Sequence, residues 1–148
     1  MLAKLPKWFY ASFRKHIEDA LEYELYFSGD MPNKDARIDV TIIGPRIEWI
    51  AKDQYQLEMM TNILIKVPVE EDQEYLVHRM AGDCLAALLQ NIKVHKYGDD
   101  GQQLDCMKIP DDKRRQVRYV HHGIVDTETE LIQATVNCKH ELILNLGD

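Results

Sequence analysis

Hydrophobic residues recur every four positions in two stretches of the chain, which is the spacing of one face of a helix. The first stretch follows Pro6, a residue suited to the first turn of a helix, and predicts a helix over about residues 6–25. Its apolar positions are Phe9, Phe13, Ile17 and Leu21. The second stretch predicts a helix that begins near residue 70 and continues through Ile92. Its apolar positions are Leu76, Met80, Cys84, Leu88 and Ile92, widened by Ala81, Leu85 and Leu89.

Apolar and polar residues alternate strictly in other stretches, which is the pattern of a half-buried strand. In residues 37–43 the apolar face consists of Ile38, Val40 and Ile42, and the polar face of Arg37, Asp39 and Thr41. Gly44-Pro45 then either ends this strand or bends it at a sheet edge. Alternation resumes at Ile47 and Trp49, and residues 51–54 are predicted to turn into the next strand.

Two longer strands are predicted over residues 54–67 and 131–146. In the first, the odd positions from Tyr55 to Val67 form a mostly apolar face, and in the second the even positions from Ile132 to Leu146 do so. The opposite faces mix polar and apolar residues. Because these strands are much longer than the usual ~5–6 residues, we expect their mixed faces to contact another surface.

Shorter strands over residues 104–109 and 117–125 complete the pattern. The economical arrangement is an α+β fold, with a single antiparallel or mixed β-sheet, two main helices packed on one face and a long β-hairpin. The 148 residues suit one domain, 1–148, with one core.

Charge narrows the class of partner. Acids outnumber bases by 25 to 18, a net charge of −7, whereas nucleic-acid binding usually depends on an excess of Lys and Arg. In the amino-terminal stretch of the chain, Lys4, Lys7, Arg14 and Lys15 all precede the first acid, Glu18, as in a transit peptide or a membrane-surface helix. The apolar stripe of the predicted helix 6–25 continues past these bases into acidic residues, without a break that resembles a cleavage site. This favours a helix of the folded domain over a targeting segment. No apolar run approaches the ~20 residues of a membrane span, so no membrane contact is expected.

Cysteine and histidine are the residues that most suggest chemistry. Cys84, Cys106 and Cys138 are widely spaced and form no CxxC, which is typical of reduced thiols rather than of a zinc site or a disulfide framework. Cys138 and His140 share a strand face, ~7 Å apart by the rise per residue. A direct pair is conceivable, but the apolar row around them favours a core cysteine and a hydrogen-bonded core histidine.

No other arrangement of residues predicts a reaction. His121 and His122 are adjacent in a strand and therefore point to opposite faces, which argues against a shared metal ion. Asp99 and Asp100 lack the spacing of a calcium loop, and no phosphate-binding or catalytic motif is present. We therefore predict no catalytic, cofactor-binding or metal-binding residue, and we do not expect an enzyme.

The order of the elements resembles the tail terminator (tail completion) proteins of long-tailed bacteriophages and the related neck proteins that join tail to head. The resemblance rests on "WFYASFRKHIEDAL" as the opening helix, "ARIDVTIIGP" as the first strand, "YQLEMMTNILIKVPVEEDQEYLVHRMAGDCLAAL" as a long strand into a helix, and "LIQATVNCKHELIL" as the closing strand. It covers nearly the whole chain, in pattern and size rather than in an invariant motif.

The resemblance implies a structural virion protein without cofactor or catalytic activity. Such proteins form homo-oligomeric rings, typically hexamers, on the last ring of the tail tube protein, end its polymerisation and present a surface to the head-tail connector or stopper protein. DNA passes through the bore without specific binding, and a negative net charge suits such a bore because it repels phosphate. The implied location is the neck of the virion, after assembly in the host cytoplasm.

Contacts with a neighbouring subunit or the tube are expected on the mixed faces of the two long strands and in a basic turn. The candidate residues are Gln54, Gln56, Glu58, Met60, Lys113, Arg114, Arg115, Gln133, Thr135, Asn137 and Lys139. Other functions stay open: a head-tail stopper or baseplate protein, a small metal-dependent enzyme, and a regulator that binds nucleic acid through the basic turn. The enzyme would use His121, His122, Cys138 and His140.

Overall fold

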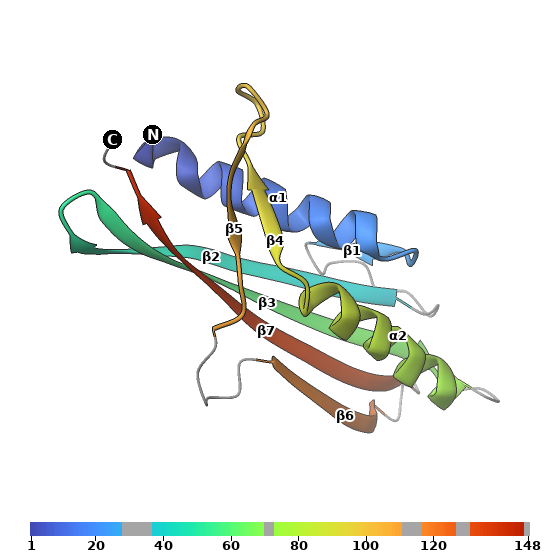
Figure 1. Cartoon of the computed structure of the whole chain (residues 1–148). Helices are drawn as coiled ribbons and strands as arrows, with labels where there is room; N and C mark the ends of the chain where they lie inside the picture. Colours follow the sequence, from blue (N-terminus) through green and yellow to red (C-terminus); the bar gives the residue numbers. More distant parts are fainter. Residues whose placement is uncertain (28–36, 70–72, 111–116, 127–130, 147–148) are drawn as a thin grey trace.

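The computed structural model describes residues 1–27, 37–69, 73–110, 117–126 and 131–146 and has an α+β architecture (Figure 1). A short 3-10 turn, Leu2–Lys4, leads into α1, Leu5–Ala20, and the second helix, α2, spans Gln73–Leu88. The large sheet has the strand order β1-β2-β3-β7-β6. Its strands are β1 Leu25–Tyr26, β2 Arg37–Ala51, β3 Gln54–Pro68, β6 Val117–Asp126 and β7 Leu131–Asn145. A small second sheet pairs β4, Ile92–His95, with β5, Gln103–Met107.

The large sheet is mixed because β1 lies parallel to β2, whereas all its other pairs are antiparallel. The predicted fold class is confirmed, and the two-stranded sheet is an addition to it. α1 ends five residues before the predicted limit, because Leu21 adopts an extended backbone while its N–H still bonds Ile17 O at 3.1 Å. The chain is thereby freed to form β1.

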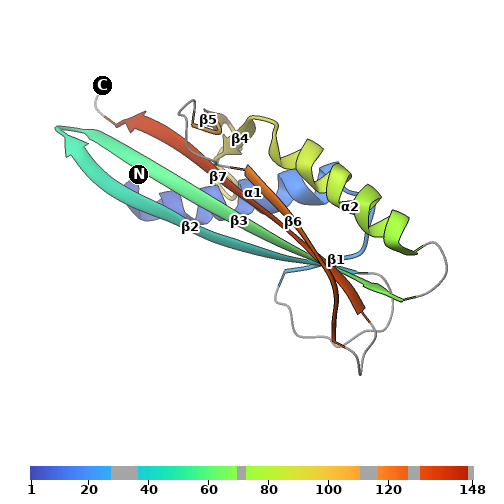
Figure 2. The same cartoon turned by 90° about the horizontal axis from the view of Figure 1, so that it is seen from below.

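One face of β3 and β7 carries the core, as the alternation predicted. Odd positions of β3 from Leu57 to Val67 and even positions of β7 from Ile132 to His140 are buried. Both helices pack on this face, in two adjoining clusters. One cluster joins α2 and the end of α1 to the sheet, and the other joins the start of α1 to β4, β5 and the sheet (Figure 2).

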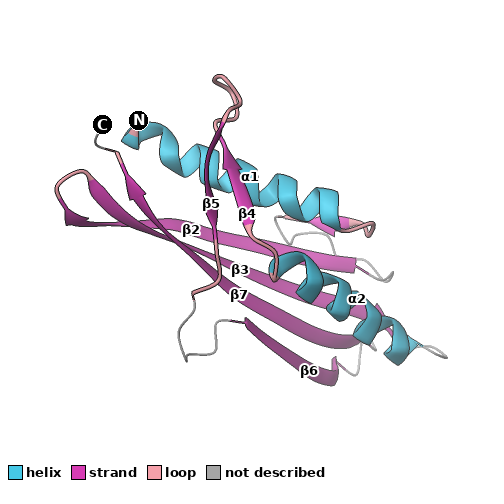
Figure 3. Cartoon of the chain, viewed as in Figure 1, coloured by secondary structure: helices cyan, strands magenta, loops and turns pink. Residues whose placement is uncertain are grey.

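The β2–β3 hairpin is continuous through Gly44-Pro45, a cis peptide bond at which the strand register shifts. Gly44 has φ +122°, and a Cβ there would lie 2.7 Å from Glu58 O, so only glycine fits. The hairpin turns at Lys52–Asp53, inside the predicted 51–54. Its tip reaches past the amino-terminal end of α1 (Figures 1 and 3).

The prediction that Leu89 and Ile92 belong to the second helix is wrong. Ile92 begins β4, and Leu89 is 58% exposed just beyond the end of α2. The small sheet packs against α1, so Ile92 is buried there rather than on α2. The sequence spacing could not reveal that the helix ends before Ile92. Ile92 lies four residues after Leu88 and so continues the helical period, although it belongs to a strand. Cys84 is buried, as its position on the apolar stripe of the second helix predicts.

Candidate interaction surface

Cys138 and His140 lie in the core, on the face of β7 that the helices cover. Cys138 Sγ is 3.7 Å from His140 Nδ1 and 3.8 Å from Leu88 O. His140 Nε2 is 3.4 Å from Gln90 O, and its ring packs edge-on against Phe13 with centroids 5.3 Å apart. Burial raises the pKa of Cys138 to about 12 and lowers the pKa of His140. Both side chains are therefore held neutral, and the predicted core cysteine and hydrogen-bonded core histidine are confirmed.

His121 and His122 point to opposite faces of β6, as predicted. His122 Nε2 is 3.0 Å from Thr135 Oγ1, on the side away from the helices. His121 stacks on His78 of α2, with ring centroids 4.8 Å apart, and His78 Nδ1 is 2.8 Å from Tyr119 Oη. Among the described residues, no group of three or more His, Cys, Asp or Glu is positioned to hold a metal ion.

The two long strands bring eight of the predicted contact residues onto one surface. β3 and β7 pair antiparallel in continuous register, so even positions of β3 lie beside odd positions of β7, as Met60 lies beside Lys139. These positions point away from the helices, and no described helix packs on them. We call this surface the open face. It includes Gln54, Gln56, Glu58, Met60, Gln133, Thr135, Asn137 and Lys139. The other candidates, Lys113, Arg114 and Arg115, lie outside the described residues.

Charges on the open face are paired across the strands. Lys139 Nζ lies 3.3 Å from Glu58 Oε1 and 3.1 Å from Glu141 Oε1, and hydrogen bonds to these carboxylates raise the pKa of Lys139. Arg46 of β2 forms an ion pair with Glu48 and reaches Glu58 Oε2 at 4.0 Å. Neighbouring strands shield this ladder, since the side chains of Glu58 and Lys139 are 21% and 29% exposed. Each charge at the centre of the open face therefore lies beside an opposite charge, with the three acids Glu48, Glu58 and Glu141 exceeding the two bases Arg46 and Lys139.

A second ion cluster, at the β1 end of the open face, was missed from the sequence. Arg37 donates to Asp39 Oδ1 through Nε at 3.0 Å and Nη2 at 2.6 Å, and Lys66 Nζ is 3.2 Å from Asp39 Oδ2. Alternation placed Arg37 and Asp39 on this face correctly, but Arg37 is only 2% exposed. Its guanidinium lies over the ring of Tyr26, 4.6 Å from the centroid. This burial could not be predicted, because β1 is a two-residue strand without a periodic pattern.

Exposed apolar side chains flank the ion ladder and occupy the hairpin tip. Ile43 and Met60 are direct neighbours across β2 and β3 and are 49% and 44% exposed, and Ile143 on the same face is 54% exposed. Near the tip, Trp49 is 72% and Ile50 45% exposed. Trp49 was not among the predicted contact residues, although an aromatic residue beside a predicted turn was a usable signal. Apolar groups gathered in this way mark contact surfaces.

Comparison with models of known protein families and with curated protein sequences gives no match. In the parts of the chain that the structure describes, no helix combines the length and the apolar character needed to cross a membrane. The open face and the hairpin tip are thus the features from which a function is to be argued.

Proposed function

We propose that this chain is a structural subunit of a ring that closes the tail tube of a long-tailed bacteriophage, ends tube polymerisation and joins the tube to the head connector. The proposal combines the resemblance of the element order to tail terminator proteins with one structural observation. That observation is the gathering of the predicted contact residues on the open face. In this role the chain binds proteins, uses no cofactor, catalyses no reaction and resides in the neck of the virion.

The composition of the open face suits a protein partner. Ile43, Met60 and Ile143 supply apolar area that a partner would remove from water. Each charge of the ladder around Lys139 and Glu58 already lies beside an opposite charge within the subunit, so a partner would cover ion pairs rather than isolated charges. The one acid in excess could meet a base of the partner.

The hairpin tip supports contact with the tube. Trp49 is the type of residue that most often contributes strongly to binding at interfaces. The tip is tied to the end of β7, because the N–H of Leu146 donates to Asp53 O at 2.7 Å. A restrained hairpin loses little conformational freedom when it binds, which favours affinity.

The acidic balance of the chain supports a bore that DNA traverses. A net charge of −7 per subunit repels phosphate and disfavours tight, non-specific binding of DNA.

Co-sedimentation with purified phage particles tests the proposal and separates it from a head-tail stopper. The protein is incubated with tail tubes that lack heads and, separately, with heads that carry only their portal complex. We expect saturable binding to one end of the tubes. Binding to portal-bearing heads alone would instead favour the stopper, and a monomer at high concentration that binds neither would contradict both.

A further inference from the structure

The charges of α1 run against the dipole of the helix. Lys4 is the N-cap and Lys7 lies in the first turn, without an acid and without a side-chain cap, whereas the last turn carries Glu18 and Asp19 and no base. The amino-terminal end of a helix has a partial positive charge and the carboxyl-terminal end a partial negative one, so each of these charges destabilises the helix. This pattern is the reverse of what the stability of α1 alone would favour.

Two ion pairs within α1 repeat the same order. Arg14 Nε is 2.8 Å from Glu18 Oε1, and Lys15 Nζ is 3.3 Å from Asp19 Oδ1. In each pair the base precedes the acid by four residues, which is the less stabilising order. A surface element whose charges oppose its own dipole at both ends is a candidate for a contact outside the subunit.

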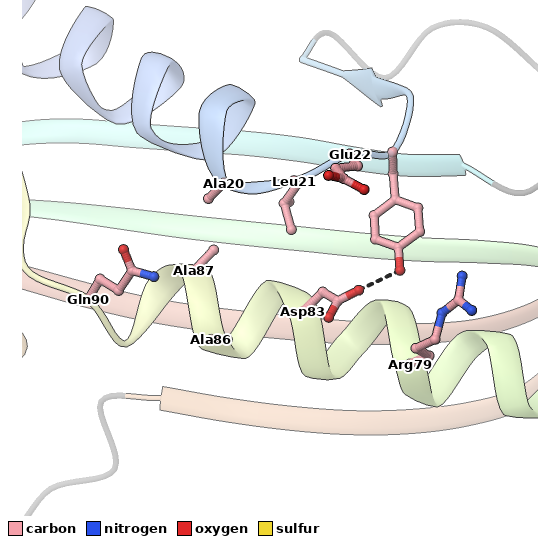
Figure 4. A pocket seen from close by; sticks show the side chains of 9 residues that line it. Ala20, Leu21, Glu22, Arg79, Asp83, Ala86, Ala87 and Gln90 are labelled. Carbon is pink, nitrogen blue, oxygen red and sulfur yellow. Dashed lines mark hydrogen bonds between the residues drawn. The ribbon is translucent and has the colours of Figure 1, made fainter.

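The acidic end of α1 opens onto a cavity of about 540 Å³ between this end and α2 (Figure 4). Glu22 and Asp83 line it, and Asp83 Oδ2 accepts the hydroxyl of Tyr23 at 2.5 Å. Glu22 is exposed and has no hydrogen bond or ion pair within the described residues. Among the described residues of the lining Arg79 is the one base, and it interacts with Tyr23 and Asp83, which leaves Glu22 as the acid without a counter-charge. The small side chains that leave room are Ala20, Ala86 and Ala87. The cavity can therefore accept a cationic side chain.

The basic end of α1 lies beside the β4–β5 turn. Lys4 Nζ is 2.9 Å from Asp99 Oδ1, and its hydrogen bond lowers the pKa of Asp99, so these two charges neutralise each other. Lys7 forms no hydrogen bond or ion pair in the described part of the chain, but its charge also lowers the pKa of Asp99, and its side chain lies beside Gly98 of the turn. Lys7 and Lys96 together carry two positive charges beside this turn, against the one negative charge of its remaining acid, Asp100. Lys7 is the base best placed to meet a partner.

We propose that the basic end of α1 in one copy of this chain docks at the acidic end of α1 in a second copy, with Lys7 entering the cavity beside Glu22. The occupant is a second copy because the two ends of one surface helix carry complementary charges. The contact joins two different surfaces, so it is head-to-tail and can close into a ring. An antiparallel pair centred on the helix would instead bring Arg14 and Lys15 of both copies together. The inference rests on the proposed function for self-assembly and assigns the surfaces that join.

Charge reversal at the two ends tests the contact. Lys7→Glu and Glu22→Lys each change an exposed side chain without a hydrogen bond or ion pair in the described residues, so both variants should fold, which circular dichroism and thermal melting check. Lys7→Glu also removes the attraction between Lys7 and Asp99, and the melting curve measures that effect. Sedimentation velocity of the full chain, free and with purified tail tubes, measures assembly. Each variant alone should self-associate about 3- to 10-fold more weakly, because attraction at every contact becomes repulsion. The control Lys93→Glu, an equal charge change on exposed β4, should assemble like the unmodified chain.

Mixing the two variants gives the sharper result. The reversed end of Lys7→Glu attracts the reversed cavity of Glu22→Lys, so an equimolar mixture should regain assemblies of the original size, in alternating order. Recovery of dimers alone would overturn the head-to-tail arrangement. If both variants assemble normally, or if the mixture fails to recover, the contact is overturned while assembly of the unmodified chain still supports the proposed function. If the unmodified chain never assembles, even on tubes, both the head-to-tail contact and the proposed function are contradicted.

Discussion

Burial determines how the cysteines of this chain behave. Cys84 and Cys138 lie in the apolar core, and burial raises the pKa of each thiol to about 12. Cys106 on β5 is only half-buried. The thiolate is the reactive form of cysteine, so a buried thiol with a raised pKa is a poor nucleophile and a poor metal ligand at neutral pH.

Thiol titration should therefore separate the three cysteines. In the folded protein at pH 7.5, we expect a thiol reagent to modify Cys106 readily and Cys84 and Cys138 at least ~10-fold more slowly, because they are protonated and covered. All three should react at similar rates in denaturant. Rapid modification of Cys138 in the folded protein would revive the hypothesis of a Cys138–His140 nucleophile.

His140 should make the fold less stable in mild acid. Its pKa is lowered in the folded chain by burial, so the unfolded chain binds a proton first as the pH falls below about 6.5, the ordinary histidine value. Stability is thus present above that pH and is lost as the pH falls through it. The free energy of unfolding, measured with urea, should fall less between pH 7.5 and 5.5 in His140→Leu than in the unmodified chain. Equal losses in the two proteins would show that His140 does not contribute.

At the scale of elements, one face of β3 forms the core and the other belongs to the open face. Two adjacent methionines, one on each face, test this assignment. Met59 is fully buried against α1 and the small sheet, whereas Met60 is 44% exposed on the open face. We expect Met59→Ala to lower the free energy of unfolding by about 2–5 kcal/mol and Met60→Ala to change it by less than about 0.5 kcal/mol. Urea denaturation measures both, and equal effects would contradict the assignment of the faces.

The two tryptophans form a second matched pair, on the hairpin and on α1. Trp49 is 72% exposed, whereas Trp8 is 4% exposed and its Nε1 donates to Asp99 at 3.1 Å. Trp49→Ala should leave the free energy of unfolding within about 0.5 kcal/mol but weaken binding to tail tubes at least ~10-fold, as loss of an interface anchor does. Trp8→Ala should destabilise the fold by about 3–5 kcal/mol. Unchanged tube binding by Trp49→Ala would exclude the hairpin tip from the contact.

Elements that alternate over many residues were predictable, and those defined by distant neighbours were not. Along β3 and β7 the buried face repeats so often that the two sides, and with them eight candidate contact residues, follow from the sequence. Arg37 lies on the predicted side, but its burial depends on Tyr26 of β1, which no local pattern indicates. Ile92 keeps a helical period, yet a turn after Leu88 places it in β4. Trp49 was not predicted as a contact residue, because its exposure depends on how far the hairpin extends beyond the helices.

At the scale of the whole molecule, the surfaces available for contact are distinct and differ in character. The open face is partly apolar with paired charges, the hairpin tip exposes Trp49 and Ile50 beside the charged turn residues Lys52 and Asp53, and the ends of α1 carry opposite charges. Several unlike surfaces on one subunit are what a head-to-tail ring with a further axial partner requires, since each subunit must contact two neighbours and the tube through different patches.

Electron microscopy of the purified full chain mixed with headless tail tubes tests this account most directly. We predict closed rings with a central bore, seated at one end of each tube, and tubes that no longer elongate when more tube protein is added. Tubes that keep elongating, with no ring at either end and only monomers in the background, would contradict the account.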